Sequence, residues 1–207
     1  MYRFLKIDFS GDSKLAVFDA CLFLFTAVIF HFWAIIYSVL IIAATLRNYK
    51  KNNNIFLIPL VAFITVFILF LLFSLIINPD WTKTVIQDST INFNFYYFKN
   101  IIQRLAVSIF FAMLVLFFVL ILAQITSKAL LIQAALRKIF AWLFLSVFIF
   151  ILSPYKSNDI LFFTIIPLVI IASNYIEFSN DKILKEIFLI TNLLLGIVFF
   201  TLQTFFI

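Results

Sequence analysis

The sequence predicts an all-α fold, a polytopic bundle of about six transmembrane helices. Hydrophobic residues make up 66% of the chain and charged residues only 12%, whereas a soluble domain carries about 25% charged residues. Long apolar runs, separated by short polar connections, recur along the whole sequence. These runs lack the polar and apolar alternation of an outer-membrane barrel, so only helices can satisfy their backbone groups in lipid.

The first apolar run extends from Leu15 to Leu46 and contains a single formal charge, Asp19, and the single histidine, His31. At about 1.5 Å per residue this run is longer than a hydrocarbon core of about 30 Å. We therefore expect one long helix that tilts, or one that begins after Asp19 and leaves this carboxylate at the interface. The expected span is 20–46.

The remaining apolar runs predict further spans of ordinary length. The second and third are long enough to cross alone, while the next two are short and read as a tight helical hairpin joined by the turn 154–159. The expected boundaries are 55–77, 105–127, 139–153, 160–176 and 187–204.

Basic residues predict the orientation. The connections 47–54, 128–138 and 177–186 are rich in Lys and Arg, and such connections stay on the cytoplasmic side. Both termini, the loop 78–104 and the turn 154–159 are then expected on the outer side. The polar segment 1–14, with three basic residues, opposes this rule, which would be explained if it were an internal loop of a longer chain.

Two ionisable residues of the first run are candidate sites. His31 falls near the middle of the expected helix, with Ser38 and Thr45 on nearly the same face. It could relay protons or contact a substrate, or it could be a neutral histidine bonded between helices. Asp19 could be buried, but a carboxylate in the first helical turn at the interface is the simpler interpretation.

The loop 78–104 holds two candidate carboxylates, Asp80 and Asp88, followed by an aromatic-rich stretch. An amphipathic segment of this kind is typical of the headgroup layer. It could act as a lid over a lipid-linked substrate, or only as an aromatic anchor. Tyr155 and Lys156 in the next outer turn complete the candidate residues.

Composition argues against several classes of site. One histidine and one cysteine, Cys21, leave no multi-histidine or cysteine metal site and no internal disulfide. Nucleotide-binding and hydrolase motifs do not occur, so we expect no cofactor and no metal. The net charge of +6 reflects basic residues that flank spans, so we expect no nucleic acid but a lipid bilayer and other membrane proteins or a lipid-linked substrate as partners.

Three blocks together resemble an uncharacterised family of multi-pass inner-membrane proteins of Gram-negative bacteria. They are Ser13–Phe18 before the first span, the basic block Leu46–Lys51, and Leu152–Leu161 followed by Pro167. Members look longer at the N-terminus. The C-terminal layout is also similar to the membrane half of polyprenyl-phosphate-sugar glycosyltransferases, whose catalytic carboxylate lies in an early outer loop. No residue of this chain matches that position.

Three hypotheses follow, and whether the chain is an enzyme stays open. The first is a non-catalytic component of the bacterial cell envelope. The second is the membrane half of a glycosyltransferase-like enzyme that uses a lipid-linked sugar at the outer face. The third is a small transporter with His31 in its path.

Overall fold

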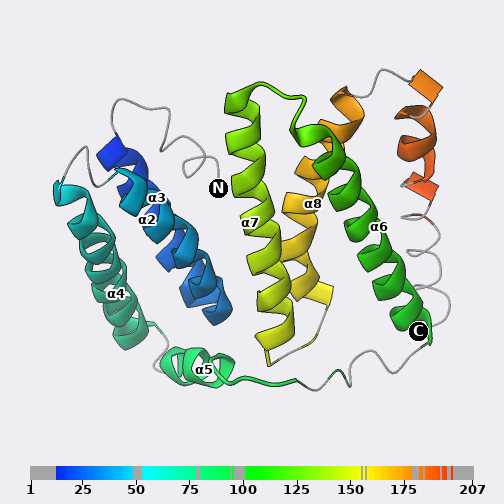
Figure 1. The fold of residues 1–207 in the computed structure, drawn as a ribbon. Coiled ribbons are helices and arrows are strands. Elements are labelled where there is room, and N and C mark those ends of the chain that lie inside the picture. The colour runs from blue at the N-terminus through cyan, green and yellow to red at the C-terminus, as the bar shows by residue number, and fades with distance from the viewer. Residues whose placement is uncertain are drawn as a thin grey trace. The chain divides into compact units, whose positions relative to one another are not determined.

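Helices are the regular elements of the described chain, which confirms the all-α prediction for that part (Figure 1). Four of these helices are long and apolar enough to cross a membrane: Ile55–Ile76, Gln103–Ala123, Ile132–Leu152 and Ile160–Glu177. The computed structural model describes residues 13–48, 53–77, 80–93, 95, 101–154, 156, 158–178, 182–183, 185–191, 193–194 and 197. Most of the span expected at 187–204 lies outside these residues.

The chain divides into two compact units. The first comprises Met1–Phe93 and Ala141–Tyr155, and the second comprises Asn94–Phe140 and Lys156–Ile207. Helix α7 (Leu130–Leu152) contributes residues to both.

The expectation of one continuous helix over 20–46 is wrong. The chain forms α2 (Ser13–Phe30), the 3₁₀ helix η1 (Phe32–Tyr37) and α3 (Ser38–Asn48). His31 between them is extended, with φ −148° and ψ 102°. Its amide donates to the oxygen of Ala27 at 2.9 Å and closes α2, while its carbonyl accepts from the amide of Ala34 at 2.9 Å and opens η1.

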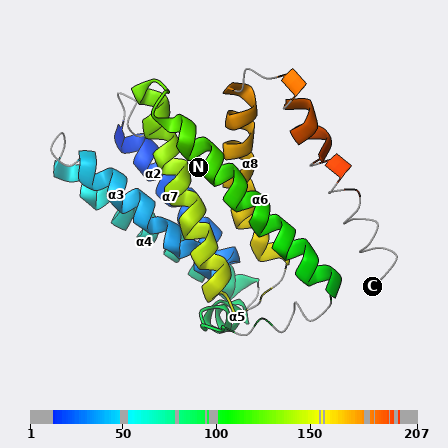
Figure 2. The same cartoon turned by 45° about the vertical axis from the view of Figure 1, so that its right-hand side comes forward.

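The break reverses the chain and produces a helical hairpin. The ribbon of α3 returns beside α2 (Figures 1 and 2), and α2 packs against both α3 and α4. We call the end where α2 begins and α3 finishes the basic end, and the opposite end, at His31, the turn end. Each limb measures about 27–28 Å, close to the thickness of a hydrocarbon core of about 30 Å.

Helix α4 (Ile58–Ile76), entered through the 3₁₀ helix η3 (Asn53–Leu57), runs in the same direction as α2. The rings of Phe25 and Phe63 meet edge to face with centroids 5.2 Å apart. The buried residues of α4 are Ala62, Val66 and Ser74. Small side chains let helices approach closely in a membrane, so this chain achieves close packing here without glycine.

Two further elements complete the first unit. The short helix α5 (Trp81–Asp88) packs against η1 at the turn end. On the C-terminal half of α7, the buried Ser146 makes a 2.8 Å hydrogen bond with the hydroxyl of Tyr37. The amide of Asn92 donates to the carbonyl of Leu152 at 3.4 Å, so the end of α7 also lies at the turn end.

The second unit is built on α6 (Ile101–Ile125) and α8 (Asn158–Phe178), which pack together. The ring of Tyr175 on α8 lies 6.4 Å from that of Phe117 and 6.0 Å from that of Phe188. Helix α8 continues through the buried Pro167. Both α7 and α8 are longer than the expected 139–153 and 160–176 spans.

Candidate functional site

The turn end of the first unit is the place where the structure gathers candidate residues. His31 is half-buried there, at a helix terminus. It is therefore not at the middle of a helix, and the face shared with Ser38 and Thr45 does not exist. Instead, Thr45 is buried and its hydroxyl donates to the carbonyl of Ile42 at 2.8 Å.

Helix α5 is held at this turn by aromatic contacts. The ring of Trp81, the first residue of α5, lies 5.9 Å from that of Phe30 at the end of α2. It lies 5.1 Å from the ring of Phe73 near the end of α4. Both pairs are edge to face, an arrangement favoured by the aromatic quadrupole. One indole thus joins three helices at the turn end.

The two loop carboxylates have different surroundings. Asp88, the last residue of α5, is half-buried and lies within electrostatic range of the His31 imidazole. Asp80 is exposed and accepts a 2.7 Å hydrogen bond from the ammonium of Lys83. Asp88 is therefore the carboxylate whose charge acts on His31, while Asp80 belongs to a surface ion pair.

The remaining candidates lie elsewhere. Asp19 is half-buried in the second turn of α2, toward the basic end. The expectation that the helix begins after Asp19 is wrong, because α2 begins at Ser13. However, Asp19 is only about 9 Å along the helix from that start, still within reach of an interface. Tyr155 lies outside the described residues.

Lys156 belongs to the second unit and is buried, with 3% of its surface exposed. Its ammonium lies 5.2 Å from the centre of the Phe95 ring. Burial lowers the pKa of this lysine below its ordinary value, because desolvation disfavours the charged form. The face of the Phe95 ring acts to raise this pKa, since an aromatic face attracts a cation and so favours the charged form.

Sequence reasoning missed polar groups that η1 brings into the first unit. The indole N–H of Trp33 is buried, and the described part of the chain offers it no hydrogen-bond partner. Tyr37 reaches Ser146, whose hydroxyl also lies 2.8 Å from the carbonyl of Trp142. Each was visible as a polar group inside an apolar run, but no sequence pattern indicated that Tyr37 would meet Ser146.

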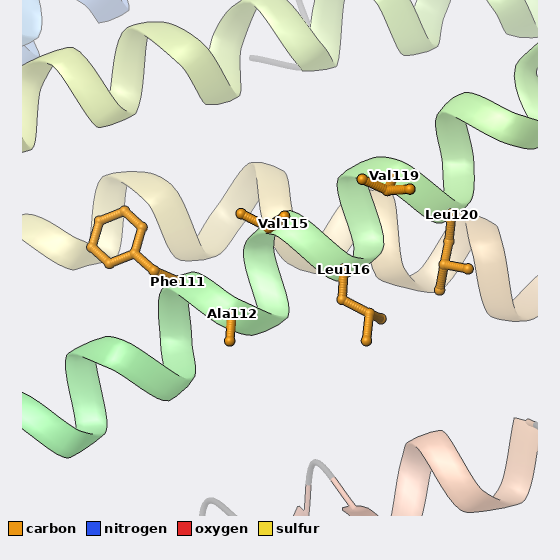
Figure 3. A pocket seen from close by; sticks show the side chains of 6 residues that line it. All are labelled: Phe111, Ala112, Val115, Leu116, Val119 and Leu120. Carbon is orange, nitrogen blue, oxygen red and sulfur yellow. The ribbon is translucent and has the colours of Figure 1, made fainter.

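The second unit presents a different surface, an open groove of about 670 Å³ along α6. Figure 3 shows that its six lining side chains all come from this one helix. They are apolar, and Val115, Leu116 and Val119 are exposed. Such a surface suits hydrocarbon chains and has no group for acid, base or metal chemistry. The lining residues are Phe111, Ala112, Val115, Leu116, Val119 and Leu120.

Chemically, the turn end offers a half-buried imidazole with a carboxylate, Asp88, in its electrostatic surroundings. No group of three or more residues that could bind a metal occurs among the described residues. Comparison with known proteins adds no relative: neither a protein-family model, nor a curated protein, nor a solved structure matches this chain.

Proposed function

We propose that this chain is a multi-pass protein of a bacterial inner membrane, where it serves as a non-catalytic component of the cell envelope. The observation that supports the membrane location is the exposure of its apolar helices. Only 17% of the α4 span and 11% of the α6 span are buried. On α4 the exposed side chains include Phe63, Ile64 and Phe67, which water would penalise and lipid or another membrane protein would accept.

The scatter of the candidate residues supports a non-catalytic role. Within the first unit, Asp19 lies toward one end of α2 and His31 at the other, and Asp80 is bound to Lys83. Acid and base catalysis needs groups that converge on one reacting atom. Only His31 and Asp88 approach this arrangement.

A complementation experiment tests the proposal. The gene is deleted in its own host, and envelope integrity is measured by detergent sensitivity with wild-type and variant copies. We expect His31→Ala, Asp80→Asn and Asp88→Asn to restore integrity fully at wild-type abundance in the membrane fraction. Failure of any of these variants at normal abundance would contradict a non-catalytic role.

The alternative is the membrane half of a glycosyltransferase-like enzyme that acts on a lipid-linked sugar at the outer face. The electrostatic influence of Asp88, the last residue of α5, on His31 favours it, because a carboxylate and an imidazole are groups that take part in proton transfer with a sugar hydroxyl. For this alternative, Asp88→Asn should reduce cell-surface glycan strongly while Asp80→Asn leaves it unchanged. Equal glycan levels in both variants would remove its support.

The transporter hypothesis loses its main observation. It required His31 at the middle of a membrane helix, whereas His31 ends one helix and begins another.

A further inference from the structure

The hairpin changes how the chain must be threaded through a membrane. If residues 15–46 formed one span, the segment before α2 and the connection 49–52 would lie on opposite sides. Because α3 returns beside α2, both segments leave the same end of the hairpin. If both limbs cross the membrane, the hairpin adds one crossing and reverses the side expected for every segment before residue 47.

With this extra crossing, the distribution of basic residues along the chain agrees with the rule that Lys and Arg are retained on the cytoplasmic side. The connections that alternation assigns to the same side as the basic end are those before α2, between α3 and η3, between α6 and α7, and after α8. Nine of the fifteen Lys and Arg residues lie in or next to these connections: Arg3, Lys6, Lys14, Arg47, Lys50, Lys51, Lys128, Lys182 and Lys185. Two more, Arg137 and Lys138, lie inside α7, about two turns from its start at Leu130.

The opposite side receives the other four, Lys83, Lys99, Arg104 and Lys156. Two of these have local partners within the described chain, since Lys83 pairs with Asp80 and Lys156 lies over the Phe95 ring. With a single first helix, by contrast, the basic residues before α2 fell on the side poor in positive charge. The segment 1–14 therefore conflicted with the charge rule only because one continuous helix was expected where the chain turns at His31.

We propose that the basic end of the hairpin faces the cytoplasm and the anionic phospholipid headgroups of the inner leaflet, and that His31 and α5 face the outer side. Positive charge near membrane spans is retained on the cytoplasmic side, and anionic headgroups there attract it. The indole of Trp81 suits the opposite interface, where its ring can lie among headgroups. This inference rests on the membrane location proposed above.

Single-cysteine labelling tests the orientation. Cysteines are introduced one at a time at Ser13, Asn52, Ser127 and Thr90 of the full chain, and spheroplasts are treated with a membrane-impermeant maleimide before or after lysis. The wild-type chain, whose Cys21 is buried, gives the background, and a Cys21→Ala background repeats the series. We expect Thr90→Cys to react in intact spheroplasts and the other three variants to react several-fold more after lysis.

The outcomes separate the two proposals. Labelling of Ser13→Cys in intact spheroplasts, with Asn52→Cys protected, would show a single crossing between them and would overturn the inference. Labelling of both from outside would overturn it as well, since the basic end would then face outward. If the chain is absent from the carbonate-resistant membrane fraction, the membrane location itself fails, whatever the labelling pattern.

Discussion

Packing between α2 and α4 offers the sharpest test of the hairpin, because Phe63, near the start of α4, reaches Phe25 of α2 only if the chain turns at His31. Ala62 on α4 is fully buried, whereas Ala27 on α2 is exposed. Replacing either alanine by leucine adds the same atoms to an apolar helix. Ala62→Leu should therefore disturb the packing of the two helices, and Ala27→Leu serves as the matched control.

The expected loss of stability in Ala62→Leu follows from the lack of free space around this buried residue. Extra methyl and methylene groups in a packed interior typically cost about 1–3 kcal/mol, which corresponds to a change of roughly 5- to 150-fold in the folding equilibrium. In the membrane location proposed above, the atoms added at Ala27 contact lipid, which is as apolar as leucine itself. We expect the control to change the free energy of unfolding by less than about 0.5 kcal/mol.

Reversible unfolding in lipid bicelles measures both variants against the wild-type chain. A proximity measurement accompanies it: Phe25→Cys with Phe63→Cys should be joined by a short bifunctional maleimide, and Phe25→Cys with Leu69→Cys should not, since Leu69 is exposed. If Ala62→Leu is as stable as Ala27→Leu and the first cysteine pair does not cross-link, α2 does not pack on α4 and the hairpin is refuted.

Three other predictions concern single contacts. Tyr37→Phe and Ser146→Ala should show a coupling of about 0.6 kcal/mol in a double-mutant cycle, the usual size of a hydrogen bond between membrane helices, and a coupling of zero would show that the 2.8 Å bond does not contribute. Trp81→Ala should speed amide exchange throughout α5, because it removes two edge-to-face contacts worth about 0.5–1.5 kcal/mol each; unchanged protection would mean that this ring does not hold the helix. The pKa of Lys156, lowered by burial, should fall further in Phe95→Leu, because the ring stabilises the cation. Isotope-edited lysine titration measures it, and a rise would contradict the contact. Since the unfolded chain binds this proton more tightly, stability should increase with pH between the lowered pKa and 10.5.

Apolar composition and run length were sufficient to predict helices in lipid, and the later runs were located well. The expected 55–77 and 105–127 spans correspond to α4, Ile58–Ile76, and α6, Ile101–Ile125. These predictions succeeded because the need to satisfy backbone groups in lipid depends on the local sequence alone. The same reasoning underestimated the length of α7. Arg137 and Lys138 suggested a connection between spans, although they lie inside the helix.

The sequence identified individual residues of the candidate site but not their arrangement in space. His31 and Asp88 were each recognised as unusual residues, but the electrostatic effect of Asp88 on His31 depends on the hairpin and on the docking of α5. The ion pair of Asp80 with Lys83 is local, three residues apart on one helix, and it belongs to the class of contacts that sequence spacing can suggest.

The sequence by itself determined that this protein is helical and apolar, with its charge concentrated in a few connections. Only the tertiary structure decided that the first apolar run is two limbs rather than one helix. No glycine or proline marks the turn at His31, and one extended residue between two hydrogen-bonded turns is enough to reverse the chain. The limb α2 is held there by packing along α4, and α3 packs on α2; these contacts join residues far apart in the sequence, and no local pattern records them.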